Sequence, residues 1–205
     1  MLTLIHSPNS RSTAILSLIE EMGIRGWIDV REVTIPRFDG SGARDPSNPH
    51  PEGKVPALVH EGRVITERGA IILHLTSLFP DTSLAPRVGT AEWGTFAMWM
   101  AWYQGVLEPT FMMEAGGFSH PWLTAAVRDH KTAVARLRAA LENGPWIMGD
   151  AFTAADILLH GPYAWFPDAM PEDALVRDWV ERCKARPASL KVREADAARM
   201  AQLAA

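Results

Sequence analysis

The residues from Gly53 to Ile71 have the types and spacing needed to hold a short peptide. An apolar segment opens with Val55-Pro56, and proline is rarely placed inside a sheet because it lacks an N–H. We therefore expect this position to present the backbone N–H and C=O of Val55 to a bound peptide. Glu67 follows at the expected start of a helix, where free N–H groups can hold a carboxylate. The segment is interpreted as a site for a small peptide with a free amino acid at one end.

The sequence contains no motif for binding a metal ion or a phosphate group. The sequence has no His-Glu-x-x-His and no Cys-x-x-Cys, and its seven histidines are scattered. The glycines of segment 39–42 lack the strand and helix that flank a phosphate loop. Cys183 follows apolar residues on a late helix and is interpreted as an inert packing or surface thiol. We therefore expect no metal.

Length and composition narrow the class of protein. A chain of 205 residues fits one large domain or two small ones. The net charge of -4 and the lack of a dense Lys/Arg run argue against nucleic acid or an anionic membrane as partner. One cysteine excludes a disulfide framework and fits a reducing compartment. With neither a basic leader nor a long apolar segment in the sequence, we expect a cytoplasmic protein without signal peptide or membrane span.

The first eighty or so residues alternate strand and helix patterns. We expect a strand at 2–6, a helix at 11–22, a strand at 27–33, a loop at 38–51, a hairpin at 55–65 and a helix at 67–78. The first helix places Ile15, Leu18, Ile19 and Met22 on one face and stops at Gly23. Proline, glycine, serine and threonine at 81–89 indicate a linker.

The remaining sequence is helical by pattern. Segment 91–107 is apolar nearly all round, so we expect it to be buried on several sides, between two domains and a partner subunit. A helix is predicted over 123–141, and two more over 172–185 and 187–202. Between them, Thr153 and Asp156 have the spacing of a capping box at a helix start. We assign that pair to folding and not to catalysis.

Across essentially its whole length the chain resembles the glutathione transferase superfamily. The most specific parts of the resemblance are residues 53–58, Thr66-Glu67 with Ala70-Ile71, and the cap at 152–156. The resemblance implies an α/β domain followed by an all-α domain. Residues 1–80 would form a thioredoxin-like, glutathione-binding domain, 81–88 a linker, and 89–205 an all-helical domain. It also implies that Pro56 is cis and that the protein is a homodimer.

The resemblance assigns glutathione-binding roles by position. Val55 and Pro56 would bind the cysteinyl backbone of glutathione, and Glu67 and Arg68 the γ-glutamyl group. The family usually has serine where this chain has Arg68. Its guanidinium either pairs with the γ-glutamyl carboxylate or points into solvent.

Three polar residues near the Val-Pro pair are candidates for the glycine carboxylate of glutathione. The family often places a polar or basic side chain at the position of Lys54, so Lys54 is a candidate there. Asn48 and His50 in the preceding loop could act in the same way. The alternative for Lys54 is an ordinary exposed surface charge.

The loop 7–12 implies a serine-type enzyme. In the family this loop carries the Tyr, Ser or Cys that contacts the glutathione sulfur, and here it contains neither Tyr nor Cys. The distance to the end of the first helix favours Ser10, with Ser12 and Asn9 behind it. Ser10 could also be the N-cap of that helix, and the two roles are compatible. Arg11 is interpreted as a solvated surface residue.

The chemistry implied is ionisation of a thiol. A free thiol has a pKa near ~8.5, and each unit of depression requires ~1.4 kcal/mol of preferential thiolate stabilisation. A serine hydroxyl bonded to the sulfur contributes ~1.5–3 kcal/mol and a helix N-terminus ~0.3–1 kcal/mol. Together these lower the thiol pKa by roughly one to two units, which suffices for nucleophilic attack.

The second substrate is expected to be a small apolar electrophile held between the first loop and the apolar helix. The candidate pocket residues are Trp102, Tyr103, Leu107, Phe111 and Trp165. We expect only one or two of them to contact substrate, because aromatic residues at helical spacing more often form core or dimer interface. The alternatives to a transferase are a glutathione-dependent reductase, peroxidase or isomerase on the same fold, or a non-catalytic glutathione-binding protein.

Overall fold

The computed structural model describes residues 1–204, and its contacts divide the chain into two compact units. The first unit combines Met1–Leu78 with the residues from Pro187 onward, and the second is Phe79–Arg186. The C-terminal helix therefore belongs with the N-terminal sheet and not with the other helices. The predicted domain limits at 80 and 89 stay a prediction.

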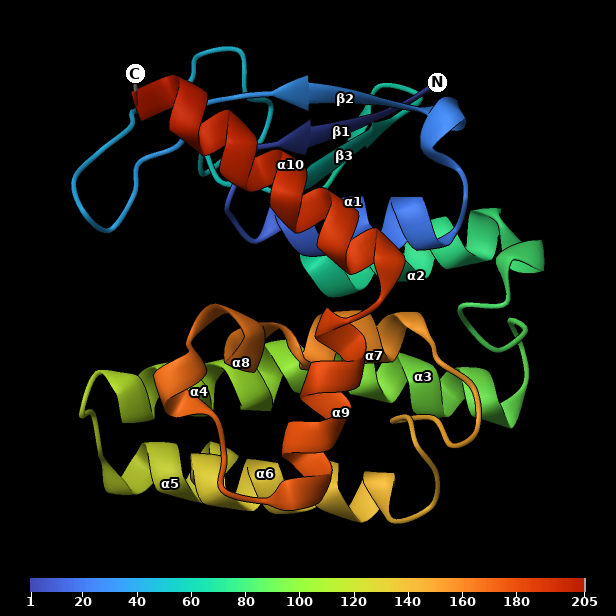
Figure 1. Ribbon diagram of the computed structural model, residues 1–205, viewed down its shortest axis with the longest axis vertical. Coiled ribbons are helices and arrows are strands. Elements are labelled where there is room, and N and C mark those ends of the chain that lie inside the picture. The colour runs from blue at the N-terminus through green and yellow to red at the C-terminus, as the bar shows by residue number, and fades with distance from the viewer. Residues whose placement is uncertain (205) are drawn as a thin grey trace. The chain divides into compact units, whose positions relative to one another are not determined.

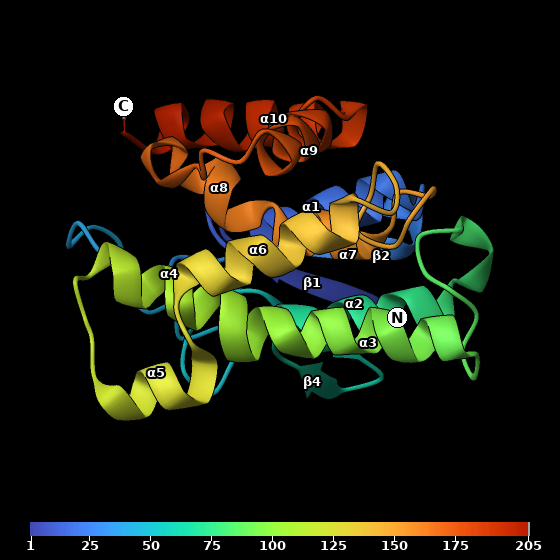
Figure 2. The same cartoon turned by 90° about the horizontal axis from the view of Figure 1, so that it is seen from below.

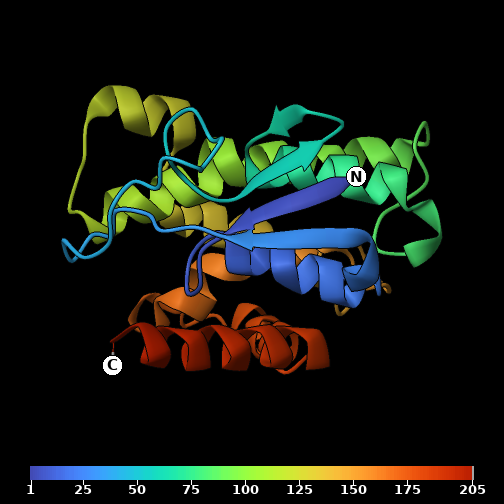
Figure 3. The same cartoon turned by 90° about the horizontal axis from the view of Figure 1, so that it is seen from above.

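A four-stranded sheet forms the centre of the first unit. Its strands are β1 (Leu2–His6), β2 (Ile28–Glu32), β3 (Ala57–His60) and β4 (Arg63–Ile65), in the order β2-β1-β3-β4. Strand β1 is parallel to β2 and antiparallel to β3, which is antiparallel to β4. Figure 3 shows β1 lying between β2 and β3. The alternation of strand and helix predicted for this unit is confirmed.

Three helices accompany this sheet: α1 (Ser12–Glu21), α2 (Arg68–Leu78) and α10 (Pro187–Ala204). The predicted apolar face of α1 is confirmed, since Ile15, Leu18 and Ile19 are fully buried and Met22 nearly so. Helix α10 packs against α1 (Figure 1). A short 3₁₀ turn, η1 (Arg25–Trp27), leads into β2.

The connections of this unit follow from their turn residues. Glu61 and Gly62 have φ values of 50° and 77°, and two positive values at the centre of a two-residue hairpin loop suit the twist of the strands. The long segment between β2 and β3 has no helix or strand, as predicted from its Gly, Pro and Asn content. The Val55–Pro56 peptide bond is cis, which confirms that expectation.

The second unit is built from helices, and Figure 2 shows α6 running beside the line of α3 and α4. Its helices are α3 (Ala91–Trp102), α4 (Glu108–Ala115), α5 (Pro121–Val127), α6 (His130–Leu141), α7 (Ala154–Leu159), α8 (Gly161–Trp165) and α9 (Ala174–Lys184). A π-helical turn, η3 (Tyr103–Leu107), joins α3 to α4, and two 3₁₀ turns occur at η2 (Pro80–Thr82) and η4 (Pro167–Ala169). An N-terminal thioredoxin-like unit followed by helices is the predicted fold class, and it is confirmed.

The predicted helix over 123–141 is wrong, because the chain breaks between α5 and α6. Arg128 has φ 67° and ψ -136°, a conformation outside any helix. Asp129 then starts a new helix, since its carboxylate accepts a hydrogen bond from the backbone N–H of Thr132. Aspartate caps a helix in this way because its short side chain reaches the second or third free N–H group.

The predicted burial of segment 91–107 on several sides is also wrong within the single chain. Gly94, Thr95, Ala101 and Gly105 are exposed, whereas Phe96 is fully buried. The mostly apolar composition misled the prediction because, apart from Glu92, the exposed members are small residues, which add little apolar surface. A position next to a partner subunit stays a prediction.

The predicted capping box at α7 is confirmed. Thr153 accepts a hydrogen bond from the N–H of Ala155, and the Asp156 carboxylate accepts one from the N–H of Thr153. Asp156 is fully buried and also accepts from the N–H of Ile147 and the indole N–H of Trp179. Burial raises the pKa of Asp156, and these hydrogen bonds oppose that rise. No helix within residues 1–204 combines the length and apolar character needed to cross a membrane.

Candidate functional site

Sheet register brings three connecting segments to one edge of the first unit. Ile5 lies opposite Ala57, so the loop that follows β1 adjoins the Val55–Pro56 turn that precedes β3. Leu58 lies opposite Ile65, so the segment that follows β4 reaches the same edge. The predicted loop serines, the Val-Pro pair and Glu67 therefore come together, although they are up to sixty residues apart in the sequence.

Val55 is anchored by its side chain. It is buried in a cluster with Ile5, Val33 and Ala57. Because these neighbours come from the sheet and its adjoining loop, they fix the position of the backbone at the cis peptide bond. Val55 precedes the start of β3, beyond the last residue pair with β1, so its backbone is held rigidly at the end of the strand.

The polar residues before Val55 have mainly internal bonds. The side-chain amide of Asn48 donates to the carbonyl of Lys54 at 3.0 Å, and its oxygen accepts from the N–H of His50 at 2.9 Å. Nδ1 of His50 accepts from the N–H of Glu52, and Asn48 and His50 are both buried. Lys54 is exposed and forms an ion pair with Glu52. Asn48 and His50 thus hold the loop, and Lys54 is the group at its surface.

Glu67 and Arg68 differ sharply in exposure. Glu67 is exposed with φ 66°, and its carbonyl accepts the N–H of Ile71 at the start of α2. Arg68 is only 7% exposed, so the alternative in which its side chain points into solvent is wrong. Glu67 therefore lies at the surface of the first unit, and Arg68 lies beneath it.

The loop after β1 carries a short chain of hydroxyls. Ser10 Oγ lies 2.7 Å from the carbonyl oxygen of Ser7, to which it donates, and 2.8 Å from Ser12 Oγ. Ser12 is fully buried, whereas Ser10 is 9% exposed, so Ser10 is the more accessible of the two. Arg11, the residue before α1, already has helical φ and ψ values. Ser10 Oγ accepts the N–H of Ser12 at 3.2 Å and the N–H of Ser10 donates to Thr13 Oγ1, so Ser10 caps the start of the helix, as predicted. Arg11 is exposed, as expected.

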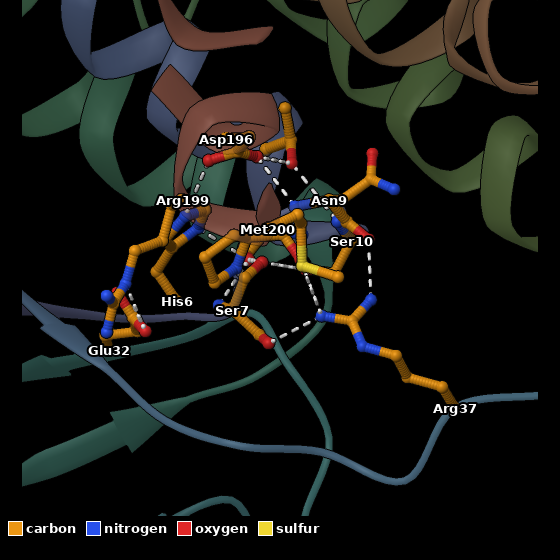
Figure 4. Close-up of polar contacts among 12 residues, drawn as sticks. His6, Ser7, Asn9, Ser10, Glu32, Arg37, Asp196, Arg199 and Met200 are labelled. Atoms are coloured by element: carbon orange, nitrogen blue, oxygen red, sulfur yellow. Dashed lines mark hydrogen bonds and ion pairs between the residues drawn. The ribbon is translucent and has the colours of Figure 1, made fainter. Parts of the chain in front are cut away.

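His6 and Asp196 extend this chain, and sequence reasoning missed both. Ser12 Oγ lies 2.8 Å from Nδ1 of His6, and Nε2 of His6 lies 3.1 Å from Oδ1 of Asp196 on α10 (Figure 4). Oδ2 of Asp196 accepts from the N–H of Asn9 and from the hydroxyl of Thr13. The C-terminal helix therefore supports the loop that carries Ser10.

The acidity of Asp196 follows from these contacts. Burial by itself raises the pKa of the Asp196 carboxyl, but hydrogen bonds from His6, Thr13 and Asn9 outweigh burial and place it below its ordinary value of 3.8. A depressed carboxyl pKa stabilises the fold above the unfolded-state pKa, and this contribution is lost as pH falls through the folded-state pKa.

Asp196→Asn is therefore expected to lower the free energy of unfolding at neutral pH, with a deficit that narrows as pH falls below about 3.8. The check is urea unfolding of both proteins over a pH series. Asp29→Asn, at an exposed position of β2, is the control for the same chemical change. A deficit that does not change with pH would contradict the assigned role of the carboxylate.

Arg37 is a second residue that sequence reasoning missed. Its guanidinium donates to the carbonyls of Pro8 and Asn9 at 2.8 and 3.0 Å, and Figure 4 shows it reaching the loop from one side. Because Arg37 lies in an irregular segment far along the chain, no spacing rule links it to this loop. It neutralises carbonyl dipoles that would otherwise repel an anion near Ser10.

The second unit contains a hollow of about 360 Å³. It is lined by Phe111, Ala115, Trp165, Phe166, Pro167, Asp168 and Ala169. Two of the five predicted pocket residues, Phe111 and Trp165, are therefore brought together. The other three, Trp102, Tyr103 and Leu107, are buried elsewhere in the unit.

A buried polar network lies next to this hollow. The ring of Phe111 meets His130 and Tyr163 edge-on. His130 bonds Glu114 through Nδ1 and the Tyr163 hydroxyl through Nε2, each at 2.9 Å. Burial raises the pKa of Tyr163 far above its usual range, so its hydroxyl stays protonated. Among the described residues no cluster of His, Cys, Asp or Glu has the composition to hold a metal ion.

Comparison with known proteins places this geometry in a family. Residues 4–83 match the family model for the N-terminal domain of glutathione S-transferases. The chain is also similar to a glutathione transferase structure from Methylococcus capsulatus, with 27% identity, a TM-score of 0.77, and coverage of 96% of this chain and 99% of that one. The chain belongs to the glutathione S-transferase superfamily.

Two further relatives of this superfamily member illustrate what its fold supports. A sphingomonad glutathione S-transferase, solved in complex with glutathione, is 25% identical with a TM-score of 0.73, covering 95% of this chain and 98% of that one. The disulfide-bond oxidoreductase YfcG of Escherichia coli is 29% identical over 68% of this chain and 71% of its own length. Membership in the glutathione S-transferase superfamily is thus compatible with more than one reaction.

Proposed function

We propose that this protein is a glutathione transferase that attaches the glutathione thiolate to a small apolar electrophile. The observation that carries the proposal is the convergence of the Ser10 loop, the Val55–Pro56 turn and Glu67 at one sheet edge. Backbone groups at Val55 pair with the cysteinyl unit, and Glu67 binds the free amino group of the γ-glutamyl unit. The proposal includes the homodimer and the cytoplasmic location expected from the family.

Ser10 is assigned to the glutathione sulfur. It is the more exposed hydroxyl of the Ser10–Ser12 pair, and the first loop contains neither Tyr nor Cys to compete for this role. A hydroxyl that donates to the sulfur stabilises the thiolate over the thiol. Ser12 supports Ser10 from beneath, and Lys54 is the surface cation assigned to the glycine carboxylate. Arg68, being buried, is assigned to holding the γ-glutamyl pocket from inside.

The electrophile is assigned to the hollow of the second unit. Phe111, Trp165 and Phe166 give it aromatic walls, and Asp168 is one of its polar lining residues. An aromatic pocket of this kind favours flat, apolar molecules over charged ones. The proposed substrate class is therefore small aromatic or alkyl electrophiles.

Disulfide reduction is the alternative with a specific observation in its favour, namely the similarity to YfcG. Against it, the single cysteine is Cys183, which is buried on α9 and cannot reach a mixed disulfide. Serine at the thiol contact favours conjugation, because serine stabilises a thiolate without exchanging with a disulfide.

The reaction is tested by supplying the purified protein with glutathione and an activated aryl halide, and in parallel with a glutathione mixed disulfide. The proposal predicts a thioether product, detected by mass spectrometry, at a rate well above the uncatalysed one. Release of free thiol from the mixed disulfide without thioether formation would replace the proposal by the reductase alternative. Glutathione binding without either product would leave a glutathione-binding protein.

A further inference from the structure

A continuous hydrogen-bonded chain links the loop surface to a buried carboxylate in the first unit. It runs from Ser10 Oγ to Ser12 Oγ at 2.8 Å, to His6 Nδ1 at 2.8 Å, and from His6 Nε2 to Asp196 Oδ1 at 3.1 Å. Figure 4 shows His6 lying between the loop and Asp196 of α10. Of the two serines, Ser10 is 9% exposed and Ser12 is fully buried, so Ser10 is the accessible end of the chain.

The donors and acceptors of this chain permit two proton arrangements. With a neutral ring, Nε2–H of His6 donates to Asp196, Ser12 donates to Nδ1, and Ser10 donates to the carbonyl of Ser7 at 2.7 Å. With a protonated ring, Nδ1–H donates to Ser12, which turns to donate to Ser10, and the hydrogen of Ser10 turns from the Ser7 carbonyl toward the ligand. The second arrangement is the one that a thiolate next to Ser10 needs.

We propose that His6 acts as the proton acceptor for the glutathione thiol through Ser12 and Ser10; this inference rests on the proposed function. The thiol proton passes to Ser10 Oγ, the original Ser10 proton to Ser12 Oγ, and the original Ser12 proton to Nδ1 of His6. The products are a thiolate that accepts a hydrogen bond from Ser10 and an imidazolium paired with the Asp196 carboxylate. The number of protons is unchanged, and no other reactant is needed. His6 never touches the substrate and is a positioning residue.

Histidine suits this role because it exchanges a proton near neutral pH and can bond at both ring nitrogens. The Asp196 carboxylate orients the ring and stabilises its protonated form, since it is itself held by Asn9 and Thr13. The His6–Asp196 end of the hydrogen-bonded chain therefore stabilises a positive charge.

The other charged groups around His6 are engaged with different partners. Glu32, opposite His6 on β2, forms an ion pair with Arg199 of α10. Arg37 from the loop after β2 donates to loop carbonyls, and Arg11 precedes α1 at an exposed position. Strand β3 contributes no charged side chain opposite the end of β1. Asp196 is thus the carboxylate that is hydrogen-bonded to the ring.

The first test uses the unaltered protein. In ¹⁵N-labelled protein, the ring nitrogens of His6 are followed by NMR as glutathione is added at constant neutral pH, with resonances assigned from His6→Asn. The proposal predicts conversion of His6 from the neutral Nε2–H tautomer to the imidazolium on binding. S-methylglutathione, which lacks the thiol proton, is the matched ligand and should leave the ring neutral. An unchanged His6 spectrum with bound glutathione, or the same change with S-methylglutathione, would overturn the proposal.

The second test follows the bound thiol by its ultraviolet thiolate absorbance over pH. His6→Asn keeps a hydrogen-bonding group near the position of Nδ1 but cannot take up a proton, so it should raise the bound thiol pKa by about one unit, a tenfold change in the ionisation constant. Calorimetry on the same samples should show a loss of glutathione affinity no larger than this factor. Ser12→Ala interrupts the chain independently and should act in the same direction. If either folded variant keeps the bound thiol pKa of the unaltered protein, the relay is wrong while the transferase proposal stands.

Glutathione binding is measured first, so that failure of the proposed function can be told apart from failure of the inference about His6. No binding by the unaltered protein would remove the proposed function and this inference with it. Binding with an unshifted thiol pKa in His6→Asn would remove the inference alone.

Discussion

Replacing Ser10 by alanine is expected to lower kcat/KM for glutathione conjugation by roughly 10- to 150-fold while leaving glutathione affinity nearly unchanged. A hydrogen bond to a charged partner contributes about 1.5–3 kcal/mol, and the bond from Ser10 to sulfur is formed only by the thiolate. The loss therefore appears in turnover and in the pKa of the bound thiol. Steady-state kinetics with an activated aryl halide and calorimetry with glutathione measure the two effects separately.

Ser17→Ala is the matched control for this substitution. Ser17 is also a mostly buried serine, and it lies on α1 beyond the loop. Its loss removes a hydroxyl of the same kind from the helix that follows the loop, so any general effect of the change on stability should be shared. Equal turnover in Ser10→Ala and the unaltered protein would contradict the assignment of Ser10 to the sulfur.

Replacing Asp156 by alanine is expected to lower the free energy of unfolding by about 3 kcal/mol or more. The carboxylate accepts from the backbone N–H groups of Ile147 and Thr153 and from the Trp179 indole. All three donors lose their acceptor in a site with no water contact, and each unsatisfied buried donor costs about 1–3 kcal/mol. Urea unfolding, followed by tryptophan fluorescence, measures the change.

Asp173→Ala provides the comparison. Asp173 caps α9 through the N–H of Val176 and pairs with Arg138, but it is only partly buried. Loss of an ordinary cap costs about 1 kcal/mol. A cost for Asp156→Ala no larger than that for Asp173→Ala would mean that the buried network does not hold the helix start. Glutathione affinity per folded molecule should be unchanged in both variants, because the Asp156 network belongs to the second unit.

Local sequence signals identified most of the fold. The apolar face of α1, the Glu61–Gly62 turn and the Thr153 cap each depend on residues within a few positions of one another, and all three were predictable. The Arg128 break was missed because apolar spacing continues across it, while the conformation of Arg128 and the cap by Asp129 leave only a weak polar signal. Hydrophobic period alone does not detect a turn inside a helical pattern.

Only the part of the candidate site that is contiguous in the sequence was predictable. Val55, Pro56 and Glu67 occupy one short stretch, and the sheet register then brings the Ser10 loop beside them. His6 and Asp196 are 190 residues apart, and their contact depends on α10 packing against α1. His6 reads as an ordinary strand residue and Asp196 as an ordinary polar residue of a helix. The sequence offers no spacing by which the two could be paired.

Arg68 shows that a matching position in a family does not by itself determine what a side chain contacts. Either a salt bridge to ligand or a solvent-facing side chain was compatible with the sequence, and its burial removes the second. A buried guanidinium keeps its charge and therefore needs polar partners. Which groups surround a side chain depends on packing, and the residue type alone does not contain that information.

Calorimetric titration with reduced glutathione shows whether Glu67 is part of a glutathione site, using the unaltered protein, Glu67→Ala and Glu61→Ala. Glu67 and Glu61 are both exposed acids with positive φ, but Glu61 lies in the hairpin turn at the opposite end of β4. We expect binding by the unaltered protein and by Glu61→Ala, and loss of binding in Glu67→Ala. Absence of binding by the unaltered protein, or equal binding by all three, would contradict the assignment of glutathione to this sheet edge.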